Sequence, residues 1–335
     1  MIDKTFFKDK VILITGGTGS FGNKFTKILL ENFKIKELII FSRDEMKQWH
    51  MMEKFKNKKL KFIIGDVRDE ASLVQASKNV DFIIHAAATK IVPTAEINPI
   101  ECIKTNILGA QNIITATKLN KIKKVVALST DKACNPINLY GASKLASDKL
   151  FISANHYPRK TKSIFSVVRY GNVMGSRGSI IPFFLEKAKT NIFPVTHFDM
   201  TRFLITLEEG VNLVFLAFKD MKGGELYVSK IPSVKIRDLP NAINKSPKIK
   251  YIGIRPGEKI HEKMISEDDA YFTYEYKNYF KILPNYVEKK DLNKYVKNGK
   301  KVKIGFSYSS NNNNDWVTDK QLKINIKKIK KELDL

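Results

Sequence analysis

The stretch VILITGGTGSFG, residues 11–22, decides the fold of this chain of 335 residues. Residues 11–15 are a short apolar, β-branched run that predicts a strand, and residues 20–32 read as a helix. Glycines between them let the backbone turn tightly and approach a pyrophosphate, which would rest on the N-terminus of the helix. We therefore predict dinucleotide binding at a turn that contains Gly16, Thr18, Gly19, Ser20, Phe21 and Gly22.

The alternation of strands and helices continues outward from this stretch. Short apolar strands are expected at 38–42, 60–64, 80–85, 125–129 and 164–169, with helices at 44–57, 69–78, 98–120 and 138–156. This rhythm is typical of an α/β protein with a doubly wound parallel (Rossmann) sheet covered on both faces.

After residue 169 the rhythm breaks, and only a helix at 207–220 and a strand at 225–228 return to the sheet. We expect a dinucleotide-binding domain of residues 1–170 plus about 205–230. Residues 171–204 and 231–335 should form a smaller C-terminal α/β substrate-binding lobe. SSNNNND at 309–315 reads as a polar loop, and a helix is expected from Lys320.

Composition excludes several classes of protein. No apolar run is long enough for a membrane span, and the start has no signal-peptide core, so we expect a cytoplasmic protein without a membrane partner. Two cysteines and five scattered histidines exclude a disulfide framework and predict no metal site. The net charge of +25 comes from dispersed lysines without a nucleic-acid motif, so we expect no nucleic-acid partner. A positive field would favour an anionic small substrate such as a nucleotide sugar.

Residues after the next strands are further candidates for cofactor contacts. Ser42 and Arg43 favour NADP over NAD, whereas Asp44 argues for NAD unless it caps the following helix. Asp66 is placed to accept from the adenine amino group, with Val67 beside it. His85 is read as structural. Ala86 and Ala87 are small enough to leave room for the cofactor. Lys90 is a candidate for contact with the ribose or the substrate, and Asn106 is a candidate for organising backbone or water near the site.

Two motifs point to catalysis. Tyr140 and Lys144 lie one helical turn apart, and a neighbouring ammonium favours the phenolate, which suits removal of an alcohol proton during hydride transfer. Thr130, Asp131 and Lys132 follow the fifth strand at the carboxyl edge of the sheet, where ligands bind. Asp131 and Lys132 form a second acid–base pair, which oxidation alone does not need but elimination of water does.

Candidate substrate contacts follow the sixth strand. Asn172 is placed to hydrogen-bond a diphosphate, and Ser179 precedes a helix that starts near Ile180. Arg202 and Arg255 suit phosphate recognition, although each also fits a structural salt bridge; Glu258 completes the turn that begins at Arg255.

With these motifs the chain resembles the UDP-N-acetylglucosamine 4,6-dehydratases (5-inverting) of pseudaminic acid biosynthesis, within the extended short-chain dehydrogenase/reductases. The matching segments are ILITGGTGSFG, IGDVRD, NPIECIKTN, LSTDKACNPINLYGASKLASDKLF, FSVVRYGNVMGSRGS and IGIRPGEK. The resemblance implies tightly held NADP and a cytoplasmic homo-oligomer, a hexamer. Thr89 and Ile91 depart from the Leu and His of the family, which bears on sugar specificity.

The resemblance also implies roles. Tyr140 would take the C4 hydroxyl proton, Lys132 would remove the C5 proton if burial and nearby cations lower its pKa, and Asp131 would protonate the leaving C6 hydroxyl. Thr130 would contact the C4 oxygen, and Asn172 and Arg255 would hold the UDP. A retaining 4,6-dehydratase, or a 4-epimerase of a related nucleotide sugar, remains the alternative.

Overall fold

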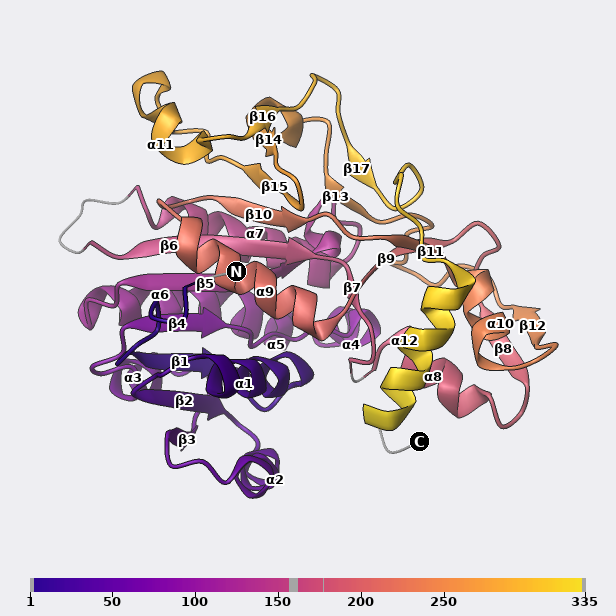
Figure 1. The fold of residues 1–335 in the computed structure, drawn as a ribbon, viewed down its shortest axis with the longest axis horizontal. Helices are drawn as coiled ribbons and strands as arrows, with labels where there is room; N and C mark the ends of the chain where they lie inside the picture. The colour runs from indigo at the N-terminus through magenta and orange to yellow at the C-terminus, as the bar shows by residue number, and fades with distance from the viewer. Residues whose placement is uncertain (1–2, 157–161, 177, 333–335) are drawn as a thin grey trace.

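The computed structural model describes residues 3–156, 162–176 and 178–332. Its main sheet has ten strands (Figure 1). Seven are parallel, in the order β3 (Leu60–Ile64), β2 (Glu37–Ser42), β1 (Val11–Thr15), β4 (Phe82–His85), β5 (Lys124–Thr130), β6 (Ile164–Tyr170) and β10 (Leu226–Ser229). Beyond β10, the antiparallel strands β15 (Tyr279–Ile282), β14 (Thr273–Glu275) and β16 (Lys300–Lys301) extend the edge. The predicted doubly wound α/β fold is confirmed.

Helices cover both faces of the parallel part. Helices α1 (Ser20–Asn32) and α9 (Leu207–Asp220) pack together on one face, and α3 (Glu70–Ala76), α6 (Gly109–Leu119) and α7 (Leu139–Ser153) lie on the other (Figure 1). Helix α2 (Glu45–Phe55) follows β2. Every residue of β1 is buried, as expected for a central strand that is apolar along its whole length.

The helix predicted at 98–120 is interrupted. The structure has α5 (Pro99–Ile103), a π-helical turn η1 (Lys104–Leu108) and then α6, with a further helix α4 (Val92–Ile97) before them. A π turn holds extra backbone per turn and so changes which side chains point inward. Here Asn106 is almost completely buried.

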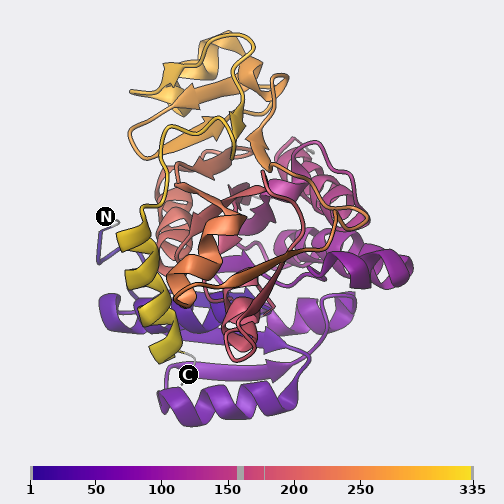
Figure 2. The same ribbon diagram turned by 90° about the vertical axis from the view of Figure 1, so that its right-hand side faces the viewer.

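A smaller lobe stands beside the carboxyl edge of the sheet (right in Figure 1, front in Figure 2). Its buried core includes Phe184, Phe193, Leu204, Leu239 and Ile326. Its elements are β7 (Asn172–Val173), α8 (Ile180–Lys187), β8 (Ile192–Val195), β9 (Thr201–Ile205), β11 (Ser233–Lys235), η3 (Ile236–Asp238), α10 (Leu239–Ile243), β12 (Lys248–Tyr251) and α12 (Asp319–Glu332).

The predicted domain boundaries remain a prediction, but residues 273–301 do not pack in this lobe. They include β14, β15, β16, η5 (Lys289–Asp291) and α11 (Leu292–Val296), and their strands lie on the main sheet. Figure 2 shows this part at the top, away from α12.

The segment of residues 308–316, here called the C-terminal segment, is more ordered than a polar loop suggests. Its first two residues form β17 (Tyr308–Ser309), which pairs with β13 (Lys263–Ile265). Along the chain, β13 is followed by the short helix η4 (Asp269–Phe272). Ser310 is fully buried, its N–H donates to Glu262 O (2.8 Å), and its Oγ accepts from Glu262 N (3.0 Å). The segment therefore fixes the backbone at Glu262.

Among the helices of the described residues, none combines the length and the apolar character that crossing a bilayer requires.

Candidate functional site

The glycine-rich turn leaves the start of α1 open to an anion. Gly16 has φ +64°, and a Cβ there would lie 2.9 Å from the backbone of Ala87, so only glycine fits. Gly19 is the N-cap of α1 and has no side chain that could cap this helix end. The N-terminus of a helix without a side-chain cap at that position suits the oxygens of a phosphate. Gly22 has a packing role, because a Cβ would lie 2.0 Å from Gly17 O.

A cleft of about 980 Å³ runs from this turn across the carboxyl ends of the strands to the smaller lobe. Its lining includes every residue predicted above for the cofactor, the chemistry or the substrate, except Gly22 and Asn106. Such a volume suits two nucleotide-sized molecules end to end. The structure thus brings the predicted residues into one site, although their individual roles remain predictions.

At the far end of the glycine-rich turn, Arg43 is exposed and its Nη1 lies 3.7 Å from Asp66 Oδ2. Partial burial raises the pKa of Asp66, but hydrogen bonds and the charge of Arg68 outweigh it and lower that pKa overall. Asp66 is therefore an ionised partner of two arginines. Asp44 accepts from Lys47 N at 2.9 Å and caps α2, which is the capping role considered for it.

His85 and Asn106 support the site from behind. His85 Nδ1 shares a hydrogen bond of 2.9 Å with Thr15 Oγ1, and burial, assisted by the charge of Lys144, lowers the pKa of His85 to about 3. It is thus a neutral structural residue. Asn106 Oδ1 accepts from Thr89 N (2.8 Å) and Asn106 Nδ2 donates to Thr89 O (2.9 Å). Its amide therefore shapes the loop that carries Lys90.

The catalytic candidates meet at the start of the 3-10 turn η2 (Asp131–Ala133). Asp131 is buried, and its Oδ1 accepts from Thr130 Oγ1 (2.9 Å) and from Lys132 Nζ (3.1 Å). Asp131 Oδ2 is buried with no hydrogen-bond partner among the described residues. Asp131 lines the cleft, so a buried polar atom with unused hydrogen-bonding capacity lies beside the space for a ligand.

The expectation that the surroundings lower the pKa of Lys132 is wrong for this structure. Burial lowers that pKa, but the carboxylates of Asp131 and Glu262 raise it more, so the pKa of Lys132 lies well above its usual range. Lys132 is therefore an ammonium, and it can act as a base only after passing a proton to a neighbour.

Tyr140 has a different cation beside it from the one expected. Burial raises the pKa of Tyr140 to about 12, and the charge of Lys132 and a side-chain hydrogen bond with Thr130 act against that rise. Burial also lowers the pKa of Lys144, while Asp148 partly offsets this. In this structure Lys132, rather than Lys144, is the main cation favouring the Tyr140 phenolate.

Gly141 explains how α7 approaches the catalytic turn. A Cβ at this position would lie 2.2 Å from Lys132 O and 3.0 Å from Pro136 Cβ. Glycine thus lets the first turn of α7, with Tyr140, pack directly on the backbone of Lys132.

Gly141→Ala should lower the free energy of unfolding by about 1–3 kcal/mol, because the helix must move off a backbone carbonyl. The same shift separates Tyr140 from Lys132 and should reduce turnover by about tenfold or more. Chemical denaturation and steady-state kinetics measure both effects. Gly210→Ala in α9 is the matched control, since a Cβ added at position 210 would meet its nearest neighbours at 3.9 Å. Equal behaviour of the two variants would contradict the packing role of Gly141.

The substrate candidates divide into two groups. Asn172 Oδ1 and Ser179 Oγ are buried in the cleft without a hydrogen-bond partner among the described residues, as groups awaiting a ligand would be. Arg255 is engaged by Glu258, with Nη2 2.7 Å from Oε1, and this ion pair must rearrange if Arg255 is to hold a phosphate. Arg177, in the loop before Ser179, lies outside the described residues.

Arg202 is mainly a clamp on the backbone. Its Nη1 donates to Thr201 O (2.7 Å) and Ile260 O (3.0 Å), and its Nη2 donates to Lys259 O (2.9 Å). These bonds hold the backbone of the segment that carries Glu262. Glu262 was not among the site residues predicted from the sequence. Glu262 lines the cleft and is almost completely buried. Its only signal in the sequence was an acidic residue close to the apolar pair Met264-Ile265.

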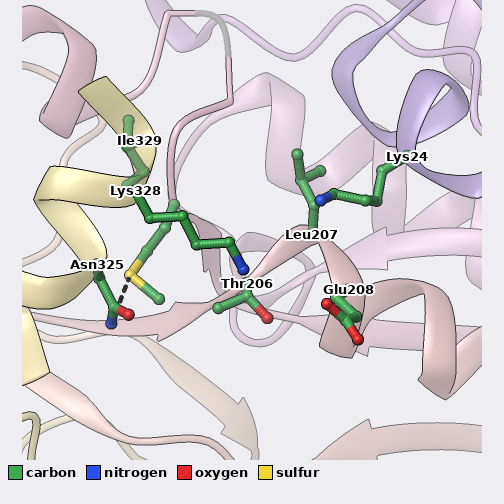
Figure 3. Close-up of a pocket in the computed structure, with 8 residues that line it drawn as sticks. Lys24, Thr206, Leu207, Glu208, Asn325, Lys328 and Ile329 are labelled. Atoms are coloured by element: carbon green, nitrogen blue, oxygen red, sulfur yellow. Dashed lines mark hydrogen bonds between the residues drawn. The ribbon is translucent and has the colours of Figure 1, made fainter. Parts of the chain in front are cut away.

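A second cavity of about 50 Å³ lies between α1, α9 and α12 and shares Leu207 with the cleft. Figure 3 shows Lys24 and Lys328 entering it from opposite sides above Glu208. Its volume suits a water or two and excludes a nucleotide. No group of three or more His, Cys, Asp or Glu within the described ranges is arranged to hold a metal ion.

Known proteins are similar to this chain in sequence and in fold. A family model described as polysaccharide biosynthesis protein matches residues 12–284. This chain belongs to that family. A family relative from Campylobacter jejuni, named UDP-N-acetylglucosamine 4,6-dehydratase (inverting), is 54% identical over 94% of this chain and 97% of its own length. The resemblance found from the motifs, and with it the prediction of an enzyme, is confirmed.

The family includes proteins with another name. A relative from Rickettsia bellii, named UDP-glucose 4-epimerase, is 44% identical over 98% of this chain and 99% of its own length. The X-ray structure of Pen from Bacillus thuringiensis is 36% identical, with a TM-score of 0.89 over 96% of this chain and 98% of Pen. The chain thus shares its fold with Pen, and its sequence is similar to relatives whose names give different reactions.

Proposed function

We propose that this protein catalyses the NADP-dependent dehydration of UDP-N-acetylglucosamine to a UDP-4-keto-6-deoxy-N-acetylhexosamine, with inversion at C5. The observation that carries the proposal is the contact of 3.1 Å between Lys132 Nζ and Asp131 Oδ1 in the cleft that also contains Tyr140. One acid–base pair for oxidation and another for elimination then face a single bound sugar. The name of the Campylobacter relative supports this reaction.

The cleft fits a dinucleotide. Gly16 leaves a space that a Cβ would close, and the uncapped start of α1 suits the pyrophosphate. Arg43 would meet a 2′-phosphate, and Tyr140 and Lys144 would border the nicotinamide end. When bound, the nicotinamide would accept the hydride from C4 and return it at C6.

Tyr140 would accept the C4 hydroxyl proton during oxidation. The ammonium of Lys132 favours the phenolate form of Tyr140 that accepts this proton, because opposite charges favour ionisation in a buried site, and Tyr140 is neutral once it holds the proton. Thr130 Oγ1 would hold the C4 oxygen beside Tyr140. The C4 ketone then makes the C5 proton acidic, since the electron pair left at C5 is delocalised as an enolate.

Lys132 and Asp131 would carry out the elimination as one unit. The proton of Lys132 passes directly to Asp131, which leaves a neutral amine and a carboxylic acid. The amine takes the C5 proton, the C5–H electron pair forms the C5–C6 double bond, and the C6–O bond breaks as Asp131 returns its proton to form water. The pair thus ends in its original protonation state. Return of the hydride to C6 would leave an enolate at C4 and C5, and a proton from solvent water delivered to C5 on the opposite face would give inversion.

The 4-epimerase reading is the second candidate, because a relative with 44% identity carries that name. An epimerase uses Tyr140 and Lys144 but needs no group that acts at C5 and C6. The ion pair of the buried Asp131 and the partly exposed Lys132 therefore favours dehydration.

Incubation of the purified protein with UDP-N-acetylglucosamine in D2O, followed by NMR, tests the proposal. A 4-keto-6-deoxy sugar with deuterium at an inverted C5 is the expected product. Retained C5 configuration would keep the dehydration and reject the inversion. A C4 epimer without deuterium at C5 would establish the epimerase instead.

Arg43→Ala should weaken NADP binding by about tenfold or more and leave NAD binding nearly unchanged, because only NADP presents a 2′-phosphate to the guanidinium. Calorimetric titration with each dinucleotide measures the difference without turnover. Lys54→Ala removes one charge from α2 outside the cleft and is the control. Equal losses for both dinucleotides would mean that Arg43 does not read the phosphate.

The remaining parts of the proposal concern the cell. We infer a cytoplasmic homo-oligomer, a hexamer, that supplies the first intermediate for pseudaminic acid-type sugars. Ile97, Ile100 and Leu108 give α4, α5 and η1 an exposed apolar surface that supports self-association. Light scattering of the purified protein decides the oligomeric state. A monomer at all concentrations would reject the inferred homo-oligomer.

A further inference from the structure

Glu262 is a buried carboxylate in the cleft that the steps above do not use. Only 2% of it is exposed, and its Oε1 lies 3.2 Å from Lys132 Nζ. Its Oε2 is buried without a hydrogen-bond partner among the described residues. A buried carboxylate is costly unless it is paired, so its placement beside Lys132 calls for a role.

The surrounding structure fixes this carboxylate firmly. Both backbone polar groups of Glu262 bond to Ser310 in the C-terminal segment, and Ser309 Oγ donates to Glu262 O at 3.2 Å. Two other cations stand farther away, with Arg202 Nε and Lys259 Nζ each 3.9 Å from a carboxylate oxygen. Those cations are also occupied elsewhere, since both donate to backbone carbonyls. Lys132 is therefore the nearest charged partner of Glu262 in the described structure.

The ammonium of Lys132 thus lies between two carboxylates, Asp131 Oδ1 at 3.1 Å and Glu262 Oε1 at 3.2 Å. During elimination Lys132 gives a proton to Asp131, and the charge attraction between these two groups disappears. Glu262 still accepts a hydrogen bond from the neutral amine at that moment. It is the contact that prevents the flexible side chain of Lys132 from rotating away from the sugar.

We propose that Glu262 is a positioning residue that holds the Lys132 amine toward C5 of the sugar and keeps the shared proton on the Lys132–Asp131 pair. This inference rests on the proposed dehydration. Glu262 does not touch the reacting atoms and acts through Lys132.

The pH dependence follows from the charges around Lys132. The amine is surrounded by Asp131, Glu262, Arg202 and Tyr140, and Glu262 is one of the two carboxylates that raise the Lys132 pKa. Without the charge of Glu262, Lys132 should lose its proton to solvent at lower pH. The pair would then have no proton for the C6 hydroxyl, so the alkaline limb of kcat should move to lower pH.

The test compares wild type with Glu262→Gln, Glu262→Asp and Glu267→Gln. Glu267 lies in the same segment and pairs with Lys263 at 2.8 Å outside the cleft, so its variant is the matched control. Trace labelling of lysines with acetic anhydride at a series of pH values, read by mass spectrometry, reports the titration of Lys132 without any turnover. The pH profile of kcat is measured on the same proteins.

In Glu262→Gln, the pH midpoint of Lys132 labelling should fall by at least about one unit. In the same variant, kcat should fall about tenfold or more at unchanged KM. Glu262→Asp keeps the charge, so labelling should stay close to wild type and part of kcat should return. Unchanged labelling in Glu262→Gln overturns the pairing, and shifted labelling with unchanged kcat overturns the positioning role. If wild type fails to dehydrate the sugar, the proposed function fails, while the labelling still decides whether Glu262 controls Lys132.

Discussion

Lys132→Ala should abolish the loss of water from the sugar while dinucleotide binding survives. Lys132 is proposed to take the C5 proton, and removal of a general base costs about 100-fold or more in rate. Single-turnover absorbance should show reduced nicotinamide that forms and is not consumed, because oxidation precedes the blocked step. NMR in D2O should show no deuterium at C5.

The alanine variant also removes a cation from between Asp131 and Glu262, so a loss of stability or of Tyr140 ionisation must be separated from a loss of the base. Lys132→Arg makes this separation, since arginine keeps the positive charge but is not deprotonated in proteins. It should carry out oxidation at C4, as the alanine variant does, and leave elimination blocked. Dehydration by Lys132→Arg at the wild-type rate would show that Lys132 contributes only charge.

Tyr140→Phe should stop the reaction one step earlier. Without the phenol no group takes the C4 hydroxyl proton, and we expect turnover to fall about 100-fold or more, with no reduced nicotinamide in a single turnover. The two catalytic variants thus differ in a visible signal, because Lys132→Ala accumulates reduced nicotinamide and Tyr140→Phe does not form it.

Tyr271→Phe is the control for the loss of a phenol, because Tyr271 is 53% exposed and lies outside the cleft. It should react as wild type does. Formation of reduced nicotinamide at the wild-type rate in Tyr140→Phe would mean that another group receives the C4 proton.

The parallel sheet in the first half of the chain was predictable because its signals are local. The strand, glycine turn and helix at residues 11–32 are contiguous, and the structure gives β1 and α1 the expected bounds. The same holds for Tyr140 and Lys144, whose spacing on one helix places both on the cleft. In each case a few neighbouring residues determine both the element and the direction of its side chains.

The surroundings of Lys132 could not be predicted in this way. Glu262 lies beside Lys132 where Ser310 bonds to its backbone and Arg202 bonds to the preceding carbonyl of Ile260, and residues 202, 262 and 310 belong to distant parts of the sequence. Burial lowers the pKa of Lys132, but the adjacent Asp131 and, through this long-range contact, Glu262 raise it more, so the condition that its pKa is lowered is not met. The π turn around Asn106 was missed because apolar periodicity does not distinguish it from a regular helix.

The bonds between the C-terminal segment and Glu262 have a consequence for how the protein is made. Domains fold progressively as the chain leaves the ribosome, with N-terminal parts first. A nascent chain that has not yet released Ser309 and Ser310 already contains every parallel strand of the sheet, but it lacks the groups that anchor Glu262. If the proposed function holds, we expect a growing chain to bind dinucleotide before it can turn over a sugar, because catalytic competence requires residues 309 and 310 to have emerged.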